Sequence, residues 1–251
     1  MIDIHAHYDD EAFDQDRDEL LTSLFNDKGV TAIINAGCNI EGSLYSIRLA
    51  EKYENIYAAV GFHPSDVDKF NEESFEKLKE LIKHEKVVAI GEIGLDYHWV
   101  SDNKDLQKAV FRKQLELAVE NDMPVVIHER DAVADCLEIV LDYNVRGVFH
   151  AFSGSKETAE ILIKRGWYIS FPGTVTFKNA KHPVENALFL PEDRILTETD
   201  SPYLTAYPFR GKRNDSSYMK YTLEKIAEIR GASFEHIERI TEENAKRLFG
   251  F

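Results

Sequence analysis

Short apolar runs alternate with longer amphipathic stretches along the whole chain. The runs are rich in β-branched residues and predict buried parallel strands at eight places. These places are Ile2–His5, Thr31–Asn35, Ile56–Gly61, Val87–Glu92, Val125–His128, Gly147–His150, Tyr168–Phe171 and Ile195–Thr199.

Between the runs, apolar residues recur at spacings of three and four, which is typical of helices that pack on one face. Asp18–Asp27 has such a face, and Gly29 is a plausible stop for this helix. Two further faces are marked by Phe75, Leu78, Leu81 and Ile82 and by Phe111, Leu115, Ala118 and Val119. Two more helices are expected at the end of the chain, with Ser233 and Thr241 as N-caps.

Eight strands alternating with helices over 251 residues predict an α/β fold, a (β/α)8 TIM barrel that forms one domain over residues 1–251. The structural alternative is an open, doubly wound sheet. Such a sheet usually has a glycine-rich turn after its first strand. Here the first strand runs into His5-Ala6-His7-Tyr8-Asp9-Asp10, which contains no glycine and favours the barrel.

The composition limits the partners that we expect. A net charge of −15 argues against broad electrostatic attraction to nucleic acid or anionic membranes. Bound divalent cations invert the charge of a site locally, so a polyanionic substrate stays compatible with this charge. The chain has no long apolar stretch and no secretory signal, and its two cysteines show no disulfide spacing. We therefore expect a reduced, cytoplasmic protein with no membrane association and no obligate protein partner.

Imidazoles and carboxylates follow the predicted strands at the points where those strands end. His5 and His7 lie two residues apart, so they point to the same face of their strand. Three other predicted strands end in Glu92, His128 and His150, and Asp200 follows the last strand. One such residue alone is commonly a cap or a paired polar group. In a parallel barrel, however, all these ends meet at the rim that carries the chemistry, and this set suits two ions about 3.5–4 Å apart.

These motifs resemble the TatD-type metal-dependent hydrolases, usually described as deoxyribonucleases, which belong to the amidohydrolase-like barrels. The resemblance covers essentially the whole chain, and the motifs occur in family order. They are His5-Ala6-His7, Gly91-Glu92-Ile93-Gly94-Leu95-Asp96-Tyr97, Val126-Ile127-His128, Phe149-His150-Ala151-Phe152-Ser153-Gly154 and Thr199-Asp200-Ser201-Pro202-Tyr203-Leu204.

The resemblance implies a site for each of two divalent ions. One ion would be held by His5, His7 and Asp200, and the second by His128 and His150, with Glu92 as the bridge between them. The ions would be Mg²⁺, Mn²⁺ or Zn²⁺, since histidine suits zinc and manganese whereas carboxylates with water suit magnesium.

The resemblance also implies residues that contact the substrate. His63, in Gly61-Phe62-His63-Pro64, would contact the substrate near the metals, and the loop Arg210-Gly211-Lys212-Arg213-Asn214 would bind phosphate through Arg210, Lys212 and Arg213. A solvated basic loop is the competing interpretation. Asn244 matches a recurrent family position and is also consistent with a purely structural role.

The leading hypothesis is a divalent-metal-dependent deoxyribonuclease that acts on DNA from an end or on single strands. Asp200, Glu92 and His63 are its predicted catalytic residues, and Asp200 would orient the attacking water or take its proton. Aromatic side chains also gather near this rim in sequence, and they either stack on unpaired bases or pack loops. They are Tyr97, His98, Trp99, Tyr203, Tyr207 and Phe209. The first alternative is an ester or amide hydrolase on the same barrel, such as a D-aminoacyl-tRNA deacylase with tRNA as its partner. The second is a metal-stabilised binding protein without catalysis.

Overall fold

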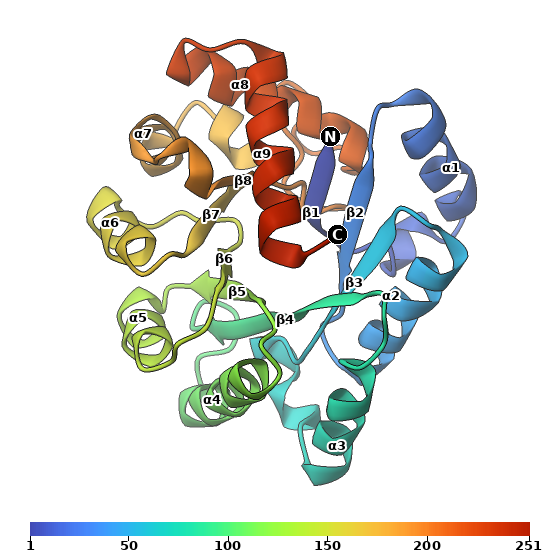
Figure 1. The fold of residues 1–251 in the computed structure, drawn as a ribbon, viewed down its shortest axis with the longest axis vertical. Coiled ribbons are helices and arrows are strands. Elements are labelled where there is room, and N and C mark those ends of the chain that lie inside the picture. The colour runs from blue at the N-terminus through green and yellow to red at the C-terminus, as the bar shows by residue number, and fades with distance from the viewer. The chain divides into compact units, whose positions relative to one another are not determined.

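The computed structural model describes residues 1–251, and strands alternate with helices along this whole range (Figure 1). The strands are β1 (Ile2–Ala6), β2 (Ala32–Ala36), β3 (Ile56–Val60), β4 (Val87–Asp96), β5 (Val125–Arg130), β6 (Gly147–Phe149), β7 (Tyr168–Phe171) and β8 (Ile195–Thr197). The helices are α1 (Arg17–Asp27), α2 (Ile40–Lys52), α3 (Glu72–Leu81), α4 (Lys104–Glu120), α5 (Val133–Leu141), α6 (Lys156–Lys164), α7 (Lys181–Phe189), α8 (Met219–Arg230) and α9 (Phe234–Phe249). A strand is present at each of the eight predicted places, so the predicted alternation is confirmed.

The chain divides into two compact units. The first unit comprises residues 1–35 and 151–251, and the second comprises residues 36–150. In the first unit, β1 pairs with β2 and β7 pairs with β8, in parallel in both cases. In the second unit, β3, β4, β5 and β6 form parallel pairs in chain order. The single domain expected over residues 1–251 stays a prediction.

The core of the first unit lies where α9 packs on β8 and β1 (Figure 1). Every residue of β1 is buried, as is typical of a parallel strand that is covered on both faces. Asn244 of α9 is buried and donates hydrogen bonds to the carbonyl oxygens of Glu192 and Ile195, at 2.7 and 2.8 Å. The recurrent asparagine therefore has a structural role, because it attaches α9 to the start of β8.

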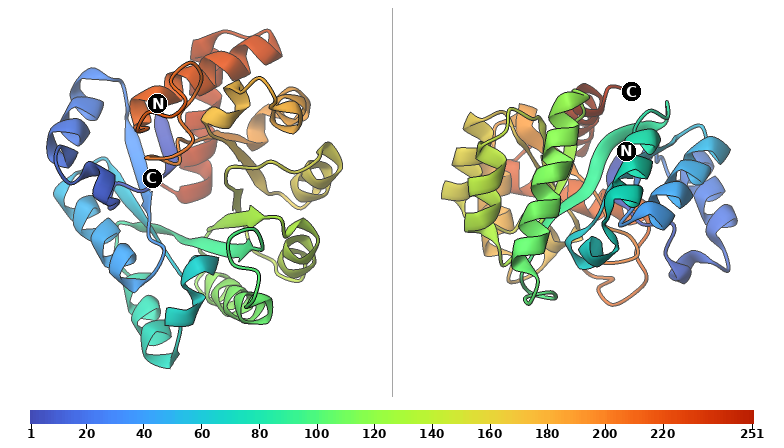
Figure 2. Two further views of the ribbon diagram at one scale, coloured as in Figure 1. Left: turned by 180° about the vertical axis from the view of Figure 1, so that it is seen from behind. Right: turned by 90° about the horizontal axis from the view of Figure 1, so that it is seen from below.

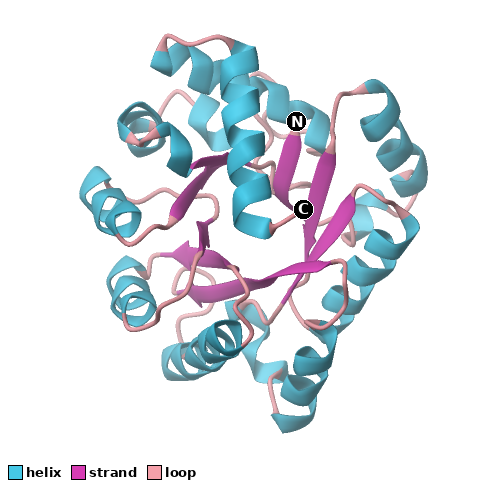
Figure 3. Cartoon of the chain, in the orientation of Figure 1, coloured by secondary structure: helices cyan, strands magenta, loops and turns pink.

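The core of the second unit lies between α4 and β4, which run side by side (Figure 2). Figure 3 shows α4 and α5 beside the strands β4 and β5. Two glutamines of α4 are buried in this core and bond to the backbone of neighbouring segments. Gln114 bonds both the nitrogen and the oxygen of Phe62, and Gln107 does the same for Asp96. These contacts hold the segment that follows β3 and the last residue of β4.

Two predicted features differ from the structure. Thr241 was expected to cap a helix but lies inside α9, where its Oγ1 donates to the carbonyl oxygen of Ile237 at 2.9 Å. A threonine hydroxyl that bonds one turn back in this way leaves the helix uninterrupted. Ser233 does cap α9, since its side chain accepts a hydrogen bond from the nitrogen of His236. Glu92 lies inside β4 rather than at its end, because pairing with β5 continues as far as Asp96 and Arg130.

Two other expectations concern the surroundings of the protein. Cys38 and Cys136 do not form a disulfide, in agreement with the spacing argument. None of the helices combines the length and the apolar character that crossing a bilayer requires.

Candidate metal centre

The first unit brings together His5, His7 and Asp200, which we call the His5 group. The Nε2 atoms of the two histidines lie 3.1 Å apart, and Asp200 Oδ1 lies 3.5 Å from His5 Nε2 and 3.4 Å from His7 Nε2. The three side chains are largely buried. Backbone pairing produces this arrangement, since Asp200 donates its N–H to the carbonyl oxygen of His5 and His7 donates to that of Ser201.

Asp3 bonds to the backbone segments that carry the His5 group, and it was not identified from the sequence. One of its oxygens accepts the backbone N–H groups of His5 and Thr199, at 3.3 and 3.0 Å. The other accepts the hydroxyls of Thr199 and Ser216, at 2.5 and 2.7 Å. Burial raises the pKa of Asp3 to about 7, and the hydrogen bonds from Ser216 and Thr199 oppose this rise. Asp3 thus ties together the segments that carry His5 and Asp200.

The second unit brings together Glu92, His128 and His150, which we call the Glu92 group. Glu92 Oε1 lies 2.7 Å from His128 Nδ1 and 2.8 Å from His150 Nε2. The two histidine nitrogens are 3.3 Å apart. Glu92 is 3% exposed, so its charge is stabilised by these neighbours rather than by water.

Asp96 orients His128 and was also not identified as a site residue from the sequence. Its Oδ2 lies 3.0 Å from His128 Nε2, which leaves Nδ1 of that ring directed at Glu92. Burial alone would raise the pKa of Asp96, but the bond to His128 and the N–H groups of Trp99 and His98 outweigh it and lower the pKa to about 2. Burial lowers the pKa of His128, yet Asp96 and Glu92 together raise it. A carboxylate behind a ligating histidine is a common arrangement at metal sites.

His63 lies beside the Glu92 group, and a backbone hydrogen bond sets its tautomer. Its Nδ1 accepts the backbone N–H of Ser65 at 3.1 Å, because His63 caps the 3₁₀ helix Pro64–Lys69. The proton of the neutral ring is therefore on Nε2, which lies 3.6 Å from Glu92 Oε1. An N–H directed this way can donate a hydrogen bond to a bound substrate, so the predicted contact role of His63 is compatible with this geometry.

The three cations of the basic loop have different surroundings. Arg210 and Lys212 are exposed and lie over the rings of Phe177 and Phe209, respectively. Arg213 instead forms two hydrogen bonds of 2.7 Å with Asp16 and donates to the carbonyl oxygen of Ala12. The guanidinium of Arg213 is thus engaged within the protein, and its predicted role in substrate binding stays a prediction.

Asn214 attaches the basic loop to the segment around Asp200. Its Nδ2 donates to the carbonyl oxygens of Thr199 and Tyr203, at 2.9 and 2.6 Å. The C-terminal end of the loop therefore lies close to a residue of the His5 group.

The spacings within both groups fit a cation. A tetrahedral ion about 2.1 Å from each ligand places its ligand atoms about 3.4 Å apart, close to the 3.1, 3.5 and 3.4 Å of the His5 group. The spacings of the Glu92 group, 2.7, 2.8 and 3.3 Å, are somewhat shorter. Each group offers imidazole nitrogens and one carboxylate, a donor set that suits zinc, manganese or iron. The bridging role expected of Glu92 stays a prediction.

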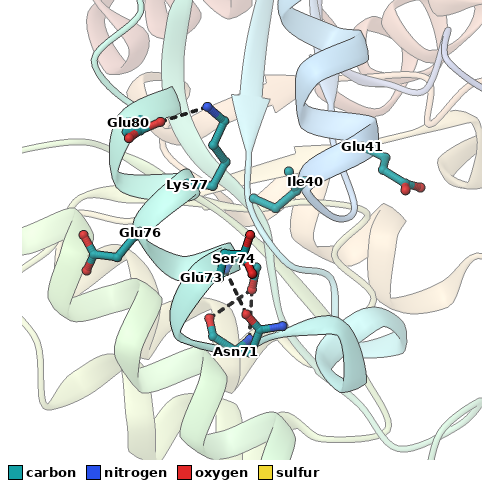
Figure 4. A pocket seen from close by; sticks show the side chains of 8 residues that line it. All are labelled: Ile40, Glu41, Asn71, Glu73, Ser74, Glu76, Lys77 and Glu80. Carbon is teal, nitrogen blue, oxygen red and sulfur yellow. Dashed lines mark hydrogen bonds and ion pairs between the residues drawn. The ribbon is translucent and has the colours of Figure 1, made fainter.

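A groove of about 490 Å³ between α2 and α3 is separate from these groups (Figure 4). It is lined by Ile40, Glu41, Asn71, Glu73, Ser74, Glu76, Lys77 and Glu80. Asn71 and Ser74 form the capping box of α3, and Lys77 pairs with Glu80 at 2.8 Å. Helix capping and surface pairing account for these polar residues, and the groove contains none of the predicted site residues.

Comparisons with known proteins show which family the chain resembles. The family model of TatD-related DNases matches residues 2–250. The uncharacterised metal-dependent hydrolase YabD of Bacillus subtilis is 48% identical, over 99% of this chain and 98% of its own length. A protein of Cronobacter sakazakii named 3'-5' ssDNA/RNA exonuclease TatD is 34% identical, over 99% of this chain and 97% of its own.

The solved structures extend the likeness to the fold. The TatD homologue YJJV of Escherichia coli matches with a TM-score of 0.93 and 30% identity, over 100% of this chain and 98% of its own. The predicted fold class is therefore confirmed. The chain belongs to the family of TatD-related DNases and is a metal-dependent hydrolase with the (β/α)8 TIM-barrel fold.

Proposed function

We propose that this protein hydrolyses phosphodiester bonds in DNA, from an end or on single strands, with divalent cations held by the His5 group and the Glu92 group. The observation that carries the proposal is the spacing of nitrogen and carboxylate atoms in the His5 group, which is close to that of ligands around one ion, together with the similar but tighter cluster of the Glu92 group. The exonuclease name of the Cronobacter relative supports a nucleic-acid substrate.

The chain supplies a general base, a hydrogen-bond donor to the phosphoryl group and cations that bind phosphate. Asp200 is the carboxylate that orients the attacking water and accepts its proton, and Glu92 is the acid of the second group. His63 donates a hydrogen bond from its Nε2–H to a phosphoryl oxygen. When bound, divalent cations polarise the phosphoryl oxygen and lower the pKa of water. Arg210 and Lys212 are exposed near the same segment as Asp200 and bind the neighbouring phosphates.

The test combines elemental analysis with a nuclease assay on one sample. The purified protein is analysed for bound metal and incubated with single-stranded DNA, duplex DNA, aminoacyl-tRNA and simple amides. Asp200→Ala removes the base and one ligand of the His5 group, and exposed Asp68→Ala is the control for loss of one surface carboxylate.

We expect DNA to be cleaved by the native protein and by Asp68→Ala, and not by Asp200→Ala, whose circular dichroism should stay native. A fully active Asp200→Ala protein would refute the assignment. Turnover of the aminoacyl ester or of amides, with DNA left intact, would replace the nuclease proposal by the ester or amide hydrolase alternative.

A further inference from the structure

Trp99 is exposed to an unusual degree for an indole. It lies just beyond the end of β4 and is 72% exposed, whereas the other tryptophan, Trp167, is 2% exposed. The hydrophobic effect opposes such exposure, so this ring is available for a contact outside the chain.

The backbone around Trp99 is held by the carboxylate that orients His128. Asp96 Oδ1 accepts the N–H groups of His98 and Trp99, at 2.9 and 2.8 Å, while its Oδ2 bonds to His128 Nε2. The position of the indole and the orientation of a member of the Glu92 group therefore depend on the same side chain.

A buried glutamine fixes the rest of this loop. Gln107 Nε2 donates to the carbonyl oxygens of Asp96 and Val100, at 3.0 and 2.7 Å, and to Asn103 Oδ1 at 2.8 Å. A preorganised loop loses little conformational entropy when a ligand binds to it.

One cationic group and one imidazole ring lie against the indole. The guanidinium of Arg130 lies over the indole of Trp99, 5.5 Å from its centroid, and the His98 ring meets it edge-on at 4.7 Å. Arg130 is exposed, and in the strand register of β4 and β5 it lies opposite Asp96. At the start of α4, which follows this loop, Lys104 lies 4.2 Å from the centroid of Tyr97. An aromatic face beside cations is the arrangement that binds unpaired bases together with their phosphates.

We propose that Trp99 and Arg130 form a stacking platform for an unpaired nucleobase of the substrate strand, next to the nucleotide that is hydrolysed. This inference rests on the proposed function and adds a subsite to it. A protein partner is disfavoured because the indole is an isolated apolar group among charged side chains, with the His98–Asp131 pair at 2.9 Å beside it. Stacking is tolerant of sequence, so the platform selects unpaired bases rather than a particular base.

The test measures binding separately from hydrolysis. The metal-loaded, full-length protein is titrated with a short oligothymidylate whose phosphorothioate linkages resist cleavage, and with an abasic strand of equal length and charge. Stacking quenches indole fluorescence, and buried Trp167 provides a constant background. Affinities of Trp99→Ala, Trp99→Phe and the control Leu188→Ala, which changes a residue that is 62% exposed elsewhere, are measured with a labelled strand.

We expect oligothymidylate to quench the fluorescence and to bind Trp99→Ala about 5- to 100-fold more weakly than the native protein. Trp99→Phe and Leu188→Ala should bind nearly as tightly as the native protein, and the abasic strand should bind native protein and Trp99→Ala equally. Equal affinity of Trp99→Ala and native protein for oligothymidylate would overturn the platform.

The same samples distinguish this proposal from the proposed function. If the native protein shows quenching and Trp99→Ala binds more weakly, but the native protein does not cleave unmodified DNA, the platform is supported and the nuclease is refuted. Cleavage with unchanged binding by Trp99→Ala would do the reverse. Self-association of the native protein that Trp99→Ala abolishes in sedimentation would assign the ring to contact between copies and overturn the platform.

Discussion

Gly94→Ala should damage the Glu92 group through a backbone contact alone. Gly94 pairs with His128 across β4 and β5 and has a φ of +145°. A Cβ atom at this position would overlap the carbonyl oxygen of His128 and lie 2.9 Å from its carbonyl carbon. The obstruction is backbone, so no side chain can rotate away, and the strand that carries His128 has to shift.

The cost can be worked out by comparison with Gly29→Ala. Gly29 also has a positive φ, +73°, but a Cβ atom there would meet nothing within 4 Å. Alanine in such a conformation costs roughly 1–2 kcal/mol, and this is the whole effect expected at Gly29. Overpacking adds about 1–3 kcal/mol, so Gly94→Ala should lower the free energy of unfolding by about 2–5 kcal/mol.

Two measurements check this comparison. Urea denaturation followed by circular dichroism gives the free energies of unfolding, and isothermal titration with Mn²⁺ or Zn²⁺ gives the ion affinities. Gly94→Ala should also weaken one ion site, because the shift of His128 changes its distances from Glu92 and Asp96. Equal destabilisation by the two variants, or native ion affinity in Gly94→Ala, would show that β5 yields without moving His128 and would refute the reasoning.

Four further predictions follow from other contacts. Asp96→Ala removes the acceptor that orients His128 and should weaken ion binding about 10- to 100-fold in calorimetry. Tyr97→Phe, which changes the next residue in the chain, should leave ion binding unchanged. An unchanged affinity in Asp96→Ala would contradict the orienting role of Asp96. Burial raises the pKa of the Cys136 thiol well above 9.0, so its stabilising contribution is complete below pH 9 and declines as the unfolded thiol ionises above it. Native protein should therefore lose more stability than Cys136→Ala, by about 1 kcal/mol, between pH 7 and pH 10 in urea denaturation, and parallel pH profiles would contradict this. Arg213→Gln should lower the free energy of unfolding by at most about 1 kcal/mol and leave KM for DNA unchanged, whereas Lys212→Gln should raise KM; the opposite pattern in steady-state kinetics would assign Arg213 to the substrate. Removal of ions by a chelator should lower the Tm and abolish hydrolysis, and Mg²⁺ or Mn²⁺ should restore both; failure of every divalent ion to restore activity would count against the metal mechanism.

The sequence by itself determined the alternation of elements, and it predicted the residues of the two ligand groups. Both are local properties. A run such as Val125–His128 is short, rich in β-branched residues and apolar up to its last residue, so it indicates a buried strand with a polar side chain near its C-terminal end. The spacing of His5 and His7 placed them on one face without any knowledge of the fold.

Tertiary structure decided the residues that support these groups, because their partners are distant along the chain. Asp3 bonds to Thr199 across 196 positions, and Asp96 reaches His128 across 32, so no local pattern indicates either contact. The same holds for Arg213, which pairs with Asp16, and for Glu92, which pairing with β5 places inside β4 rather than at its end. Periodicity reports which face of an element is buried, but only packing determines which polar groups meet there.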